Sequence, residues 1–323
     1  MKRIGSLGLS NVISFFLTLA AASAESTKLK VLTSFLPIYC FTVNVAGEWA
    51  EVENLLPANV EPHDYQLSRK DLQKINSADL IVINGLGLET WLDKVLRDPA
   101  LTKSKTILEA GAGLERQLIF GTRQFDLAMA NPSARFGRNT RLETREFPNP
   151  HVWLDPHLAG HCVTNILSAL QKADPVHATG YAANAAHFTA QLEKLDADIG
   201  RTLSPYQHAS IITYHEAFAY FARRYGLDIV GVIEPVPDVK PSLKYLASLY
   251  QTIRKSRIKA IFAEAQSTSK LADQIGRDLR VPVARLDTLE SGPLKPAAYE
   301  EVMRKNLGVL EKSLKADAPR SSS

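Results

Sequence analysis

Short β-rich runs alternate with amphipathic stretches along most of the chain, and this alternation is the feature that most constrains the fold. Strand-like runs followed by helical ones are typical of parallel sheets whose two faces are covered by helices. The expected strands are 29–35, 52–57, 80–84, 106–108 and 151–154 in the first half, and 209–214, 229–232, 260–263 and 281–286 in the second. The expected helices between them include 68–75, 90–96, 216–225, 242–256 and 269–279.

A stretch with few helix breakers, 175–203, joins the two halves. Asp174-Pro175 is a suitable helix start because proline is favoured in the first turn. About 28 helical residues would extend roughly 42 Å. We therefore expect an α/β protein of two lobes, each a parallel sheet flanked by helices, joined by one long backbone helix. The expected bounds are 25–174 for the first lobe (with a long loop, 115–149), 204–317 for the second, and 318–323 for a polar tail.

The first 24 residues have the features of a secretory signal peptide. Lys2 and Arg3 precede an apolar run, 12–21, which is followed by the small residues of 22–24. The run is too short for a convincing membrane-spanning helix. No cysteine follows the expected cleavage site, so we expect no lipid anchor. These features predict a soluble periplasmic protein.

Composition excludes several classes of protein. With 38 Lys+Arg against 34 Asp+Glu, the charge balance is too even for a nucleic-acid-binding protein. The two cysteines, Cys40 and Cys162, are too few for a disulfide scaffold or a four-cysteine zinc site. Export would allow them to form one disulfide, and two buried free thiols are the alternative.

Three histidines lie just after an expected strand or at the start of one. His63 lies beyond the second strand, His151 opens the segment 151–154, and His215 follows the strand 209–214. Asp287 directly follows the strand 281–286. Ligands of open parallel sheets bind at the carboxyl ends of strands. Two of the four residues come from each half, so they can meet only between the lobes. Three imidazoles and one carboxylate suit a tetrahedral zinc site.

Other residues leave alternatives open. A single histidine is more often a surface or hydrogen-bonded residue than a ligand. Glu216 could replace Asp287 as the acid, or could simply occupy the first turn of a helix, where negative charge is favourable. Glu264 ends a strand and either orients a ligand from outside or makes an ordinary polar contact. His157 and His161 lie four apart on an expected helix and could form a second metal pair.

Three motifs make the chain resemble a known family: Pro62-His63-Asp64-Tyr65, Asn149-Pro150-His151-Val152-Trp153-Leu154-Asp155-Pro156, and the run from Thr213 through His215 to Phe221. With these motifs the chain resembles the metal-binding solute-binding proteins of ABC importers, the ZnuA/TroA-like group, and within it the zinc branch. The resemblance implies one metal held between two lobes by His63, His151 and His215, with Asp287 at the acidic position. It also implies a membrane permease as partner.

The loop and the third ligand bear on the choice of metal. Zinc members of the group often carry a histidine-rich loop, whereas 115–149 contains six arginines and no histidine, so we expect no metal gathering there. In manganese relatives the third ligand is usually glutamate. Here His215 stands in that position, and imidazole suits zinc better than manganese.

We therefore expect a periplasmic, high-affinity, monomeric Zn²⁺-binding protein that delivers its ion to an ABC permease, with a periplasmic metallochaperone as a further candidate partner. Manganese instead of zinc is one alternative. A zinc hydrolase is another, with three histidines, an open water position and Glu216 as base. No HExxH motif or nucleophile elbow supports an enzyme. Metal-dependent adhesion is a third possibility.

Overall fold

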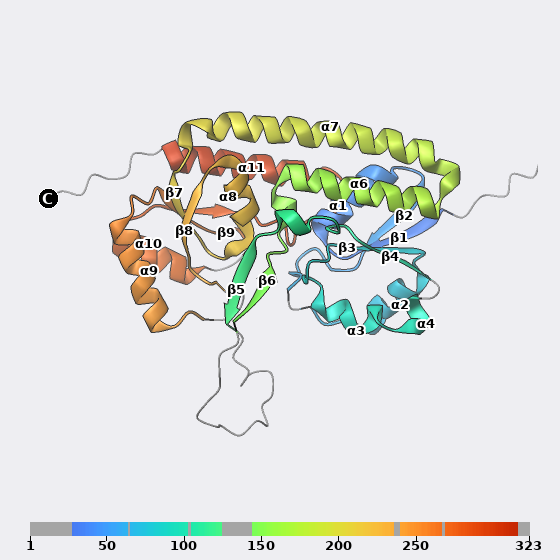
Figure 1. Ribbon diagram of the computed structural model, residues 1–323, viewed down its shortest axis with the longest axis horizontal. Coiled ribbons are helices and arrows are strands. Elements are labelled where there is room, and N and C mark those ends of the chain that lie inside the picture. Colours follow the sequence, from blue (N-terminus) through green and yellow to red (C-terminus); the bar gives the residue numbers. More distant parts are fainter. Residues whose placement is uncertain are drawn as a thin grey trace, which may run out of the picture.

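Two separate parallel sheets form the frame of the molecule (Figure 1). The computed structural model describes residues 28–63, 65–102, 105–124, 144–235, 240–266 and 269–315. The expected signal peptide, the tail 318–323 and the interior of the arginine-rich loop, 125–143, lie outside these ranges. Within the described part of the chain, no helix combines the length and the apolar character needed to cross a membrane.

The first sheet has the strand order β2-β1-β3-β4, with every pair parallel. All four residues of β3 are buried, as expected for a central strand with helices on both faces. The helix α2 begins with a capping box, in which Ser68 and Asp71 satisfy each other's backbone N–H groups. The elements are β1 (Leu29–Thr33), α1 (Leu36–Ala46), β2 (Ala50–Asn54), α2 (Arg69–Ser77), β3 (Leu80–Ile83), η1 (Thr90–Leu92), α3 (Asp93–Leu96), α4 (Pro99–Thr102), β4 (Thr106–Glu109) and η2 (Glu115–Gln117).

The second sheet repeats the parallel arrangement in the order β10-β9-β7-β8. Its helix α8 ends at Gly226, whose φ of 71° is a left-handed conformation that glycine adopts at little cost. The elements are η5 (Ser204–Tyr206), β7 (Ser210–Thr213), η6 (Glu216–Phe218), α8 (Ala219–Tyr225), β8 (Asp228–Val232), α9 (Leu243–Lys255), β9 (Ala260–Glu264), α10 (Lys270–Leu279) and β10 (Val283–Leu286).

A long helix, α7 (Ala178–Leu203), runs across both sheets (Figure 1). Its 26 residues correspond to about 39 Å. The helix α6 (Pro156–Ala173) leads into it through the short η4 (Pro175–His177), and the final helix α11 (Ala298–Lys315) also packs against it. The expected fold class, two α/β lobes joined by a long helix, is confirmed.

The two halves pack against each other as well as against α7. Tyr299 of α11 meets Phe41 of α1 edge to face, with ring centroids 5.0 Å apart. The Tyr299 hydroxyl also donates to the carbonyl of Trp153 at 2.7 Å. Both contacts are buried in a hydrophobic core that contains residues of both sheets. The halves therefore share a core, which limits how far one can move against the other.

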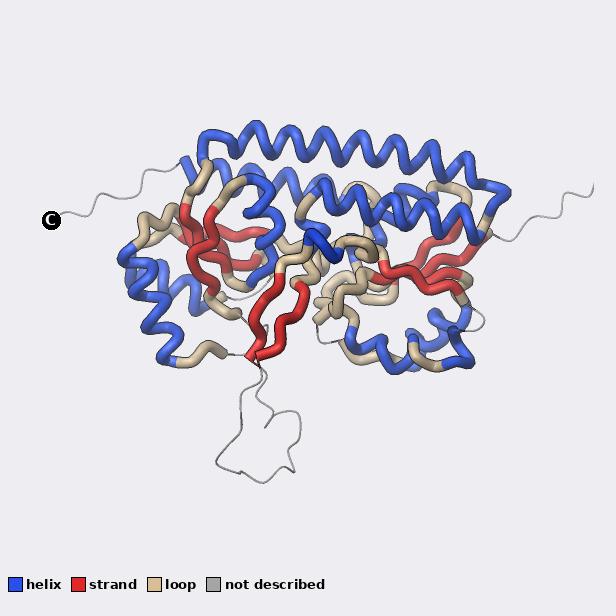
Figure 2. The backbone as a smooth tube through the Cα atoms, viewed as in Figure 1, coloured by secondary structure: helices blue, strands red, loops and turns tan. Residues whose placement is uncertain are grey.

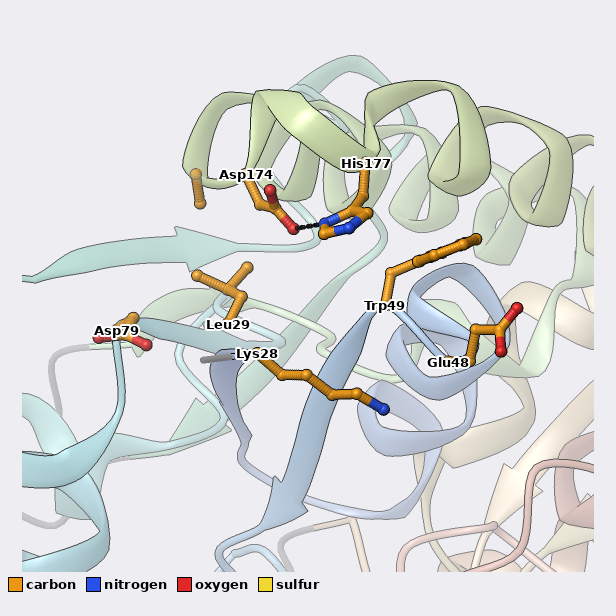
Figure 3. Close-up of a pocket in the computed structure, with 8 residues that line it drawn as sticks. Lys28, Leu29, Glu48, Trp49, Asp79, Asp174 and His177 are labelled. Carbon is orange, nitrogen blue, oxygen red and sulfur yellow. Dashed lines mark hydrogen bonds and ion pairs between the residues drawn. The ribbon is translucent and has the colours of Figure 1, made fainter. Parts of the chain in front are cut away.

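The start of the long helix is anchored to the first sheet beside a cavity of about 400 Å³ (Figure 3). The ring of His177 hydrogen-bonds Asp174 at 2.6 Å and stacks on Trp49, with centroids 4.9 Å apart. Trp49 also lies against Gly180, where an added Cβ would come within 2.3 Å of the indole nitrogen. This cavity lies at the amino end of β1, and none of its lining residues belongs to the predicted metal site.

Two sequence expectations are wrong in detail. Residues 151–154 form no strand, since Val152–Leu154 is a buried 3-10 turn, η3. A short apolar run does not distinguish a buried strand from a buried turn. The expected loop 115–149 contains an antiparallel ribbon of β5 (Phe120–Gln124) and β6 (Thr144–Pro148), which stands between the two sheets (Figure 2). These strands carry many polar residues and so lack the apolar run of a buried strand.

The two cysteines are free and buried. Of the two alternatives left open by the sequence, the structure therefore has two thiols and no disulfide. Burial raises the pKa of both Cys40 and Cys162 to about 12, so both remain protonated at neutral pH.

Candidate metal centre

His63 reaches the centre from the loop that follows β2. The indole nitrogen of Trp91 donates to the carbonyl of Pro62 at 2.7 Å and fixes the backbone beside it. The Nε2 atom of His63 lies 2.8 Å from Oε1 of Glu290. Its side chain is 14% exposed, which is more than the exposed fraction of His151, His215 or Glu290.

His151 follows β6 and immediately precedes η3. Its Nδ1 donates to Oδ1 of Asn149 at 2.7 Å, and its Nε2 lies 3.1 Å from Oε1 of Glu290. The outer contact fixes the ring orientation and the tautomer, because the amide oxygen accepts the Nδ1 proton. The other nitrogen, Nε2, is therefore left free to coordinate.

His215 directly follows the turn after β7, at the start of η6. Its Nδ1 hydrogen-bonds Oε1 of Glu264, which ends the neighbouring strand β9. Its Nε2 lies 3.2 Å from Nε2 of His151 and 4.0 Å from Oε1 of Glu290. Of the two roles considered for Glu264, the structure supports orientation of a histidine from outside.

The carboxylate of the group belongs to Glu290, and Asp287 lies outside it. The expectation for Asp287 is corrected because its side chain is used within the loop after β10. It accepts the backbone N–H of Leu289 at 2.8 Å, where the chain turns through a positive φ of 64°. Glu290, three residues further on, points into the centre, and its Oε2 accepts from the hydroxyl of Thr288 at 2.8 Å.

The four side chains present one compact set of donor atoms. Three imidazole nitrogens and one carboxylate oxygen all lie within 4.8 Å of one another. Zinc bonds to nitrogen and oxygen of about 2.0–2.2 Å place the corners of a tetrahedron roughly 3.4 Å apart. The nearest pairs are separated by 2.8, 3.1 and 3.2 Å, close to that spacing. The residues therefore fit a tetrahedral ion.

Electrostatics favour a cation here. Burial opposes the charge on Glu290, but the contact with His63 and the positive charge that His215 readily carries hold the pKa of Glu290 well below its usual value. Burial lowers the pKa of His151 to about 3, so this ring is neutral. For His215, burial acts in the opposite direction from the Glu264 hydrogen bond and the charge of Glu290, and the net result is a raised pKa. The metal-free centre thus holds an anionic carboxylate and a ring that readily keeps a proton.

The other sequence candidates lie outside this set. Glu216 occupies the first turn of η6 and is not one of the four. His161 donates its Nε2 proton to the carbonyl of Ala112 at 2.7 Å, and neither it nor His157 belongs to a group with metal-ligand spacing. Among the described residues, His63, His151, His215 and Glu290 are the one set of three or more that could hold an ion.

Sequence reasoning missed Glu290 and Asn149. The only local signal for Glu290 was an acidic residue before Ser291-Gly292, which gives no distance to a histidine 227 positions away. Asn149 was visible as the first residue of its motif, but nothing in the pattern indicates that its amide contacts His151.

Comparisons with known proteins identify the family of the chain. Residues 31–313 match the family described as ZnuA, zinc-uptake complex component A periplasmic. The zinc-binding protein AdcA of Streptococcus pyogenes is 35% identical over 96% of this chain and 61% of its own length. The chain thus spans about three fifths of that relative. The high-affinity zinc uptake system protein ZnuA of Bacillus subtilis is 32% identical over 95% of this chain and 97% of its own length.

A solved structure supports the same likeness. The solute-binding protein FpvC of Pseudomonas aeruginosa, in complex with Mn²⁺, superposes with a TM-score of 0.76 at 26% identity. The match covers 89% of this chain and 99% of FpvC.

Proposed function

Because the chain belongs to the family of the periplasmic component A of zinc-uptake complexes, we propose that it captures one Zn²⁺ ion between its two lobes outside the cytoplasm and delivers it to an ABC permease. The chain is a solute-binding protein and not an enzyme, as its family and relatives show. The observation that carries the proposal is the meeting of three imidazole nitrogens and one carboxylate oxygen within 4.8 Å, drawn from both halves of the chain.

The donor set supports zinc as the cargo. Three of the four donors are neutral nitrogen ligands, which suit zinc, whereas manganese prefers oxygen. The single carboxylate reduces the net charge of the Zn²⁺ ion and its four ligands to +1, and no second carboxylate takes part. FpvC was solved with Mn²⁺, so manganese is the competitor that a test must include.

The packing of the halves supports capture with little rearrangement. The candidate donor atoms already lie within 4.8 Å of one another, close enough to bind a single ion. The shared core around Tyr299 resists separation of the lobes. The two lobes therefore need to move apart only a little for the metal ion to enter and leave. Delivery to a permease, and loading by a metallochaperone before it, belong to the same proposal. Proteoliposomes that contain the cognate permease would test delivery.

Zinc titration tests the proposal directly. Protein stripped with a chelator should bind one Zn²⁺ per chain, tightly enough to compete with a chromogenic chelator, and Mn²⁺ should bind more weakly. His151→Ala should abolish tight binding. His187→Ala, which removes an exposed histidine from α7, should leave it unchanged. Binding only at millimolar zinc, or tighter binding of manganese, would refute the corresponding part of the proposal.

A further inference from the structure

Asn149 uses all of its polar groups in contacts around the centre. Its side-chain oxygen accepts from Nδ1 of His151 at 2.7 Å and from the His151 backbone N–H at 3.0 Å. Its side-chain nitrogen donates to the carbonyl of Glu216 at 2.8 Å. Its own backbone N–H donates to Ile119 at 2.7 Å, and its carbonyl accepts from the hydroxyl of Tyr220 at 2.7 Å. The residue is 5% exposed.

These contacts join the base of the β5–β6 ribbon, the helix α8 and the metal centre. Ile119 precedes β5 and Asn149 follows β6, so their backbone bond continues the ladder of the ribbon beyond the pair Phe120 and Pro148. The Tyr220 hydroxyl, from α8, also accepts the Ile119 N–H at 3.1 Å. One tyrosine oxygen therefore contacts both residues, Ile119 and Asn149, that flank the strands at the base of the ribbon.

The side chain of Asn149 also connects two of the candidate ligands, His151 and His215. On one side it holds the ring of His151. On the other it holds the carbonyl of Glu216, the residue directly after His215. A histidine whose outer nitrogen is held by a fixed acceptor keeps one tautomer and one orientation, and it coordinates more strongly for that reason. The spacing between His151 and His215 thus depends on a residue that is not itself in the donor set.

We propose that Asn149 and Tyr220 are positioning residues that hold His151 and the His215 turn at coordination spacing, so that metal affinity depends on the base of the β5–β6 ribbon. The inference rests on the proposed zinc-binding function. It follows that a displacement of the ribbon base weakens metal binding, because the ribbon strands, Asn149 and His151 are connected by consecutive hydrogen bonds.

Three substitutions separate positioning from general stability. Asn149→Ala removes all three side-chain hydrogen bonds, and Asn149→Asp keeps the acceptor for His151 but loses the donor to Glu216. Tyr220→Phe removes a single oxygen. The matched controls are Asn165→Ala, whose amide bonds the carbonyls of Ala110 and Ala112, and Tyr181→Phe, whose hydroxyl bonds Asp174.

Zinc affinity, the visible spectrum of the Co²⁺ form and thermal unfolding of the metal-free protein should be measured for each variant. We expect Asn149→Ala to lose about 10- to 100-fold in zinc affinity, the range typical of lost outer partners of a ligand. Asn149→Asp should recover part of this loss, and Tyr220→Phe should show a smaller loss. The Co²⁺ bands should shift in the Asn149 variants. The controls should lower the unfolding temperature but leave affinity and spectrum unchanged.

The inference is overturned if Asn149→Ala and Tyr220→Phe bind zinc as the wild type does, or if the controls lose as much affinity as they do. Should Asn149→Ala fail to fold, Tyr220→Phe decides the question by the same comparison. A wild-type protein without a tight zinc site would instead refute the proposed function, so the two failures are distinguishable.

Discussion

Oε1 of Glu290 lies 2.8 Å from Nε2 of His63, although 227 positions separate the two residues and each belongs to a different half of the chain. The loop that carries Glu290 is held in place from the first half. The indole of Trp153 donates to the carbonyl of Thr288 at 2.8 Å, and the N–H of Gly292 donates to the carbonyl of Ala58 at 2.6 Å. The carboxylate therefore reaches across the boundary between the lobes on a fixed loop.

This arrangement predicts a large effect of Glu290→Gln. The substitution keeps the shape of the side chain but removes the negative charge and one good oxygen ligand. Zinc affinity should fall by more than the roughly 10- to 100-fold that is typical of losing an outer partner. Competition with a chromogenic chelator measures the change.

Asp287→Asn is the matched control for that experiment. Asp287 accepts the backbone N–H of Leu289 and lies outside the donor set, so its amide variant should retain zinc affinity. A loss of zinc affinity in Asp287→Asn equal to that in Glu290→Gln would contradict the assignment of the carboxylate.

The contrast between these two acids shows what the sequence could predict. Strand periodicity located the ends of β7 and β10, and hence the regions in which His215 and an acid should lie. The choice between Asp287 and Glu290 depends on how four loop residues turn, including the positive φ of Leu289. A leucine gives no indication of such a turn, because positive φ is unusual for residues other than glycine, asparagine and aspartate.

The pKa shifts predict that zinc binding releases a proton near neutral pH. Burial opposes a proton on His215, but the Glu264 hydrogen bond and the charge of Glu290 outweigh it and raise the pKa of His215 above 6.5. Zinc must displace that proton, so affinity should fall by about tenfold per pH unit below this pKa. Calorimetric titration in buffers of different ionisation enthalpy counts the protons. The absence of proton release at pH 6.5 would contradict the prediction.

The same shifts fix the pH dependence of the metal-free fold. Glu290 and His151 have lowered pKa values, so each contributes stability that is lost on acidification, from about pH 4.3 for the glutamate and from about 6.5 for the histidine. His215 acts in the opposite sense: its raised pKa contributes stability below 6.5, which is lost as the pH rises through the folded value. Urea unfolding at several pH values should show a net loss of stability in acid.

The two cysteines should be unreactive in the folded protein. Cys40 and Cys162 are fully buried, and burial raises the pKa of each thiol to about 12, which leaves almost no thiolate at pH 8. A chromogenic disulfide reagent should detect no thiol in the native protein and two after unfolding in denaturant. Detection of fewer than two in the unfolded protein would indicate a disulfide. Each single Cys→Ser variant should lower the unfolded count by one and serves as the control.

Two further features of the sequence carried little information about the centre. The six arginines of 115–149 drew attention to that loop, yet the part nearest to the centre is the hydrogen-bonded base of a ribbon, where backbone groups of Ile119 and Asn149 make the contacts. Backbone hydrogen bonds depend little on residue type, so the sequence does not indicate them. The sequence indicated that Glu264 could orient a ligand, but it did not identify His215 as the partner, because that contact depends on β7 and β9 being neighbours in the sheet.

That pairing predicts a pH-dependent effect of Glu264→Gln. Glutamine still accepts the Nδ1 proton of His215, but it lacks the negative charge that makes the ring more basic. Zinc affinity should therefore fall, by up to about 100-fold at a pH above the pKa of His215, where the proton on this ring no longer competes. Because the pKa of His215 also falls, the variant should lose less affinity than the wild type on acidification, and the two affinity curves should converge toward pH 6. Glu53→Gln, which changes an exposed partner of Lys74, should follow the wild-type curve throughout. A constant ratio of affinities between pH 6 and 8 would show that Glu264 acts on His215 through packing alone and that its charge has no part in tuning the metal centre.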